Sequence, residues 1–438
     1  MDDLNLEVNG FGLVNSANIT INKINVIGGI NSSGKSTVSR FLYSFLKANV
    51  LTSEQYLKKI LFGEINHLIN IEKETFSIDD DFAEVINEFA KFKKSNKTNS
   101  QIESIDFLIN LFTGERSYFN SFVLSELIVK ENIAYFERGS SKLYSDNYVS
   151  LIANEGVNAQ FDEAGFVESY DEEYDLNSDL YVIKTDGTFN LPEIFYIDSF
   201  SILDLLHYAH YEGHEDYSEK IDIINPKNHV NYLIDSIYDQ TFFHPVEEEC
   251  NSKIIEVLNK IDDVIQGYVG SHPFSLDFTF ERIPSRTDES QNSSDNPVQV
   301  LDSGNVSSGI KQIGIIQLLL SKEKLKQGSF LIIDEPEVNL HPEWQFKFAE
   351  ILVILAKELN ITIYLNSHSP TFIESIDAFC EFYDMEDDIN YYLTQESEVS
   401  GKYDFIKVNS NELYKIYDNL GDVYKLIDNL RIRKRLNK

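Results

Sequence analysis

A glycine-rich turn near the start of the chain, GINSSGKS from Gly29 to Ser36, constrains the fold more than any other stretch. It follows a short apolar run, Asn25 to Ile27, and precedes apolar positions from Val38 to Phe45 that are typical of a helix. The spacing G-x-x-x-x-G-K-S is that of a phosphate-binding loop, which lies between a strand and a helix. We therefore expect an α/β fold in which a buried strand carries this turn to the edge of a sheet.

Each residue type in the turn has a chemical task. Glycines allow successive backbone amides to point at one phosphate, and the helix N-terminus adds the positive end of its dipole. Lys35 can reach the β- and γ-oxygens, and the Ser36 hydroxyl can bind Mg²⁺. A glycine-rich turn without a ligand is the alternative, but the flanking strand and helix favour a nucleoside triphosphate. The candidate nucleotide-binding residues are Gly29, Asn31, Ser32, Ser33, Gly34, Lys35, Ser36 and Thr37.

A second stretch, GSFLIIDEPEVNLHPEWQ from Gly328, has the pattern of a Walker B motif. The bulky apolar run Phe330 to Ile333 predicts a central strand covered on both faces. It ends in Asp334, which could hold the metal through water, and Glu335, which could polarise the attacking water. The alternative is an acid-rich helix N-terminus, but the phosphate-binding loop upstream favours catalysis.

A third stretch, ITIYLNSHSPTFIE, predicts another buried strand from Ile361 to Leu365, with His368 at its edge. A histidine in this position is often structural. Because it follows the strand after the acidic pair, we interpret His368 as the group that senses the γ-phosphate.

A fourth stretch, LDSGNVSSGIKQIGIIQLLL, predicts an apolar helix from Ile310 to Leu320 that is opened by small residues. Ser307, Ser308 and Gly309 at this helix start could form an anion site. The alternative for these residues is an ordinary N-cap.

The four motifs in this order resemble the ABC-type ATPases, and the wording DEPEVNLHPEWQ with NSHSP is similar to their SMC-, RecF- and OLD-like branch. That branch acts in DNA repair and bacterial genome defence. The resemblance covers residues 1 to about 45 and about 296 to 378. It implies Mg²⁺-dependent ATP hydrolysis with Glu335, His368 and Lys35 as catalytic residues, and Ser36 and Asp334 at the metal.

The resemblance also implies an assembly. Ser307 would meet the γ-phosphate on the phosphate-binding loop of a second, head-to-tail protomer, and Pro336 to His341 would form the D-loop. Dimers or larger assemblies are expected, together with a separate effector protein such as a nuclease or toxin. About seventy residues follow His368, which is short for a second catalytic domain.

Three positions depart from the family pattern. Ile310 stands where a glutamine is common, with Gln312 two places later, and His341 replaces the usual D-loop aspartate. A Q-loop glutamine is not placed, because nothing distinguishes Gln55, Gln101 and Gln160.

We expect four parts along the 438 residues. Residues 1–48 and 296–438 would form the two halves of the nucleotide-binding core. Residues 49–190 would be an insertion, first helical and then acidic with β or irregular structure, and residues 191–295 would add a core strand and a helical lobe. In this lobe His207, His210 and His214 could bind a transition metal or could simply lie on an exposed helix end.

The net charge of −35 means that any nucleic-acid contact would need a local basic patch. One candidate is RIRKRLNK at 431–438, which could equally be a solvated helix end. The chain shows no signal peptide, no spanning segment and two distant cysteines, which together favour a cytoplasmic protein without membrane contact. A nucleotide-gated scaffold with little turnover, and a transporter ATP-binding subunit, are the alternative functions.

Overall fold

The computed structural model describes residues 4–51, 148–153, 156–162, 191–198, 228–238, 252–271, 278–282, 299–302 and 307–421. The helices within these residues are α1 (Lys35–Leu51), α7 (His229–Tyr238), α8 (Ser252–Ile265), α9 (Ser308–Ser321), α10 (Pro342–Leu359), α11 (Pro370–Phe382) and α12 (Tyr414–Gly421). The strands are β1 (Asn5–Asn9), β2 (Val14–Thr20), β3 (Ile24–Gly28), β4 (Tyr148–Ala153), β5 (Gly156–Asp162), β6 (Ile194–Ile197), β7 (Gly267–Ser271), β8 (Phe278–Arg282), β9 (Gln299–Asp302), β10 (Phe330–Asp334), β11 (Thr362–Ser367), β12 (Ile389–Glu396) and β13 (Tyr403–Val408).

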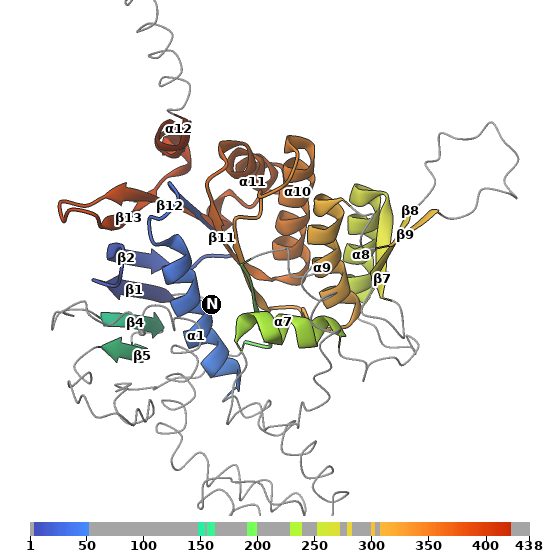
Figure 1. Ribbon diagram of the computed structural model, residues 1–438, viewed down its shortest axis with the longest axis horizontal. Coiled ribbons are helices and arrows are strands. Elements are labelled where there is room, and N and C mark those ends of the chain that lie inside the picture. Colours follow the sequence, from blue (N-terminus) through green and yellow to red (C-terminus); the bar gives the residue numbers. More distant parts are fainter. Residues whose placement is uncertain are drawn as a thin grey trace, which may run out of the picture.

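One large mixed sheet organises the fold. Its ten strands run in the order β5-β4-β1-β2-β13-β12-β3-β11-β10-β6, with β12, β3, β11, β10 and β6 mutually parallel. The hairpins β1–β2, β4–β5 and β12–β13 are antiparallel. In Figure 1 the N-terminal and β4–β5 hairpins lie on the side of the sheet away from α8, α9 and α10. A second sheet, β7-β8-β9, is antiparallel.

Both faces of the parallel strands are buried, which explains their continuous apolar runs. On β10, Leu331 and Ile333 belong to a core built with α8, α9, α10 and α11. Phe330 and Ile332 on the same strand belong to the opposite core, which contains the apolar residues of α1. The strand alternation therefore divides one apolar run between two layers of helices.

The strands and helices expected around the four motifs are all present, so the predicted α/β fold is confirmed. The segment after α11 continues as two strands and a helix, β12, β13 and α12. None of the helices in the described ranges combines the length and apolar character that a bilayer crossing requires.

The proposed division into four parts stays a prediction. Within the predicted insertion, β4 and β5 form a hairpin that pairs with β1 at the edge of the main sheet, and Gln160 lies on the outermost strand. Other predicted features lie outside the described residues. They are Gln55 and Gln101 of the insertion, His207, His210 and His214 of the helical lobe, and the basic segment 431–438.

A half-buried carboxylate between two helices should make stability depend on pH. Asp262 of α8 accepts a hydrogen bond from Gln317 Nε2 of α9 at 2.6 Å, and burial raises the pKa of Asp262 to about 6. A raised pKa in the folded state means that ionisation costs stability, so this cost appears as the pH rises from about 4 to above 6. Asp262→Asn should therefore stabilise the protein at pH 7.5 by about 1 kcal/mol after allowance for solvent screening, and have little effect at pH 4.

Urea unfolding at the two pH values measures this difference. Glu381→Gln is the control, because its carboxylate is exposed on α11 and does not act on Asp262. An equal gain at both pH values for Asp262→Asn would contradict the assignment.

Candidate active site

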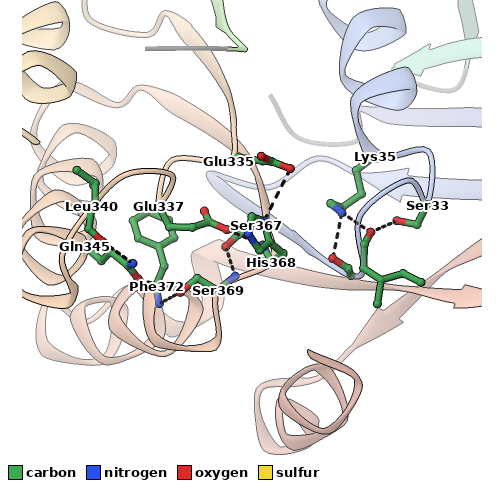
Figure 2. Close-up of polar contacts among 12 residues, drawn as sticks. Ser33, Lys35, Glu335, Glu337, Leu340, Gln345, Ser367, His368, Ser369 and Phe372 are labelled. Carbon is green, nitrogen blue, oxygen red and sulfur yellow. Dashed lines mark hydrogen bonds and ion pairs between the residues drawn. The ribbon is translucent and has the colours of Figure 1, made fainter. Parts of the chain in front are cut away.

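The parallel register of three strands brings three of the four predicted motifs together at one edge of the sheet. Gly28, which leads into the phosphate-binding loop, is opposite Ser367, which precedes His368. Asp334 is opposite Asn366 on the next strand pair. Figure 2 shows Lys35, Glu335 and His368 at this edge, with the loop and the acidic segment on either side of the histidine.

Strand β12, which is distant in sequence, packs against the phosphate-binding loop. Gly29 lies so close to β12 that a Cβ there would be 1.8 Å from Thr394 Oγ1. The same hydroxyl donates to Ser33 Oγ at 2.9 Å, and Ser33 in turn donates to the Ile30 carbonyl at 2.8 Å. Gly34 has φ +90°, a conformation that favours glycine. The loop is therefore pre-shaped by its packing.

The other loop residues differ in exposure, and Lys35, the one charged residue of the loop, is buried. Asn31, Ser32 and Ser36 are exposed, and Thr37 is half-buried. Lys35 Nζ donates to the carbonyls of Gly29 at 3.0 Å and Ile30 at 2.7 Å.

The electrostatic surroundings of Lys35 act in opposite directions. Burial lowers the pKa of Lys35, while the carboxylates of Glu335, Asp334 and Glu337 raise it. The Lys35 ammonium therefore lies close to the carboxylates of these three residues.

Asp334 is fixed by a set of hydroxyl and amide donors. Its Oδ1 accepts from Ser39 Oγ at 3.1 Å and Asn366 Nδ2 at 2.5 Å, and its Oδ2 accepts from the Tyr196 hydroxyl at 2.8 Å. Burial raises the pKa of Asp334, and hydrogen bonds, first from Ser36, lower it. A carboxylate beside a serine hydroxyl offers the oxygen ligands that Mg²⁺ prefers, so these residues fit a magnesium ion.

Glu335 has an unusual backbone and an accessible carboxylate. Its φ is +50°, a strained value for a residue with a side chain. Its N–H donates to the Asn366 carbonyl at 2.8 Å, and its side chain is 42% exposed. His368 Nδ1 lies 3.8 Å from Glu335 Oε1. This geometry leaves the carboxylate able to meet a water molecule from solvent.

The predicted signature residues lie at the start of α9 and contact α10. Ser307 is the exposed N-cap of α9, with no side-chain capping bond, and Ser308 is the first helical residue. A Cβ on Gly309 would lie 2.9 Å from Trp344 Cδ2, and Gln312 Nε2 donates to the Val338 carbonyl at 2.8 Å. Gly309 therefore packs against α10 of its own chain. Lys35, Asp334, Glu335 and His368, in contrast, meet at the edge of the sheet.

The structure also explains why a histidine, His341, can replace the usual D-loop aspartate. His341 is the N-cap of α10 and accepts from the Glu343 N–H through Nδ1 at 3.4 Å. An aspartate would cap the same helix, so the substitution preserves this structural task.

Sequence reasoning missed several residues of this site. Asn366 could have been found, because it ends a predicted strand beside the Asp334 strand. Glu337 could have been found as a third acid two places after Glu335. Tyr196 and Thr394 carry no local signal, because their contacts depend on the order of strands in the sheet.

A model of the AAA ATPase domain family matches residues 4–373, which is most of the chain. The chain belongs to the AAA ATPase domain family. The ATPase activity class predicted from the motifs is thereby confirmed, and with it the binding of ATP. The comparison with curated proteins gives no match.

Solved structures similar to this AAA ATPase include the SMC head domain from Thermotoga maritima. It has 12% sequence identity and a TM-score of 0.39, with 93% of this chain and 100% of that chain covered. The Smc head domain bound to the C-terminal domain of ScpA, derived from Pyrococcus furiosus, has 12% identity and a TM-score of 0.39, with 95% and 98% covered.

The close contact under the loop of this AAA ATPase predicts a steric effect on nucleotide binding. Gly29→Ala should push Thr394 away and disturb the loop amides, so the affinity for ATP should fall at least about tenfold. Binding of a fluorescent ATP analogue measures the change. Gly401→Ala is the control, because a Cβ at Gly401 meets nothing within 4 Å. Equal affinity for the two variants would contradict the proposed role of this packing.

Proposed function

We propose that this AAA ATPase hydrolyses Mg²⁺-bound ATP between two head-to-tail copies of the chain, in the cytoplasm. We further propose that its ATP state controls a separate effector protein, such as a nuclease, in genome defence or DNA repair. The observation that carries the proposal is the convergence of Lys35, Asp334, Glu335 and His368 at the carboxyl ends of β3, β10 and β11.

The reaction would use the chain's own groups as follows. Lys35 would exchange its two loop carbonyls for phosphate oxygens and offset their charge. Glu335 would accept a proton from the water whose oxygen attacks the γ-phosphorus, while the bond from that phosphorus to the β,γ-bridging oxygen breaks and ADP leaves. Ser36 and, through water, Asp334 would hold Mg²⁺, which supplies additional positive charge at the phosphates.

Two features support a head-to-tail arrangement. The Ser307 hydroxyl is exposed and makes no capping bond, so it is available to a phosphate bound elsewhere. In the D-loop, Val338 is 37% exposed although it is apolar. Both segments would face the phosphate-binding loop of the second copy.

The described segment after His368 is part of the ATPase core itself. Strands β12 and β13 complete the central sheet between β3 and β2. The net charge of −35 would favour an effector with a basic docking surface. Co-expression with proteins encoded by adjacent genes, followed by co-purification with and without ATP, tests this coupling.

Removal of the proposed general base tests the reaction. Glu335→Gln should lower kcat at least about 100-fold without abolishing ATP binding, because only proton acceptance is lost. Phosphate release and nucleotide binding measure the two effects. Glu343→Gln is the control, since Glu343 is an exposed acid paired with Lys347 at 3.4 Å on α10. Undiminished release from Glu335→Gln would remove the assignment. Release from the unsubstituted protein that is no higher than from Lys35→Ala would favour the scaffold alternative.

Mixing two inactive variants tests the head-to-tail arrangement. Lys35→Ala disables its own phosphate-binding loop, and Ser307→Arg blocks the site of the neighbour. In a mixed dimer one composite site keeps both native residues, so an equal mixture should recover about a quarter of the native rate. No recovery above either variant alone, in a mixture that forms dimers, would contradict sharing of the site.

A further inference from the structure

A buried carboxylate beside the proposed catalytic groups has no task in the mechanism above. The side chain of Glu337 is 3% exposed, and its Oε1 accepts from the backbone N–H of His368 at 2.7 Å. The same oxygen lies 3.2 Å from His368 Nδ1. The other oxygen, Oε2, is buried and has no hydrogen-bond partner among the residues that the structure describes.

The contacts form a chain of three groups, Glu337, His368 and Glu335. His368 Nδ1 faces Glu337 Oε1 at 3.2 Å and Glu335 Oε1 at 3.8 Å, and Figure 2 shows the histidine between this acidic segment and Lys35. Among the described residues, Nδ1 is buried and faces the two carboxylates without a well-aligned hydrogen bond, so the second ring nitrogen, Nε2, is the atom of the imidazole left for a substrate.

We propose that Glu337 is a positioning residue for ATP hydrolysis. It holds His368 in the orientation in which Nε2 meets the γ-phosphate, and this leaves Glu335 able to accept the proton of water. The inference rests on the proposed hydrolytic function and deepens it.

A purely structural role for Glu337 would not require a negative charge. The backbone bond to His368 needs only an acceptor oxygen, which a glutamine also provides. A buried carboxylate with one unpartnered oxygen costs stability, whereas a neutral amide of the same shape costs less. Burial raises the pKa of the Glu337 carboxyl, whereas the backbone N–H and the imidazole of His368 lower it, so the histidine is the neighbour that favours an acid at this position.

The turn that carries Glu337 keeps its geometry without the charge. Val338 N–H donates to the Glu335 carbonyl at 3.1 Å, and Leu340 N–H donates to the Glu337 carbonyl at 3.1 Å. The isosteric Glu337→Gln should therefore fold normally and remove only the charge at His368.

The experiment compares steady-state kinetics and thermal unfolding of full-length variants. Glu337→Gln should lower kcat about tenfold, leave KM for ATP within about twofold, and leave the unfolding midpoint equal or higher. Glu337→Asp, which keeps the charge, should retain more activity than Glu337→Gln. Adding Glu337→Gln to His368→Ala should cause no further loss, because the two residues would act as one unit.

Glu193→Gln is the matched control for the loss of a carboxylate. Glu193 pairs with Lys47 at 2.8 Å, away from the acidic segment, so its substitution should lower the unfolding midpoint and leave kcat unchanged. A native kcat for Glu337→Gln would overturn the inference, as would losses that add fully to those of His368→Ala. Full activity of Glu335→Gln would instead overturn the proposed hydrolytic function, so the two failures are distinguishable.

Discussion

The parallel pairing of β3 with β11, and of β11 with β10, is the constraint on which the site depends. This pairing places Gly28 opposite Ser367 and Asp334 opposite Asn366, so residues some three hundred positions apart in the sequence meet at one edge. A buried side chain secures the register, because Asn25 Nδ2 donates to the Ile363 carbonyl at 3.1 Å across the β3–β11 pair. The two apolar cores then hold this register from both faces of the sheet.

The charge distribution at this edge follows from the same pairing. Lys35 lies among Asp334, Glu335 and Glu337, and its ammonium is held by two carbonyls of its own loop. A triphosphate brings further negative charge to an already acidic edge. The loop amides and the lysine offset part of this charge. The proposed Mg²⁺ would offset more of it beside the buried Asp334, whose oxygens accept hydrogen bonds from Tyr196, Ser39 and Asn366.

Local sequence was sufficient for the elements around each motif. The runs at Asn25–Ile27, Phe330–Ile333 and Ile361–Leu365 predicted strands because both faces of a parallel strand are apolar, and the structure has β3, β10 and β11 there. The insertion was less predictable, since the acidic segment around β4–β5 contains little periodic pattern. Its pairing with β1 is a long-range contact that no local propensity specifies.

From the sequence alone we predicted the candidate residues of the site: a lysine, a serine, two acids and a histidine, each at the end of a strand or the start of a helix. Only the tertiary structure decided which other residues support them. Thr394 reaches the loop and Tyr196 reaches Asp334 because β12 and β6 occupy particular places in the sheet. Glu337 meets His368 because the turn after β10 folds toward the end of β11. Such contacts depend on strand order and backbone geometry, which a motif does not encode.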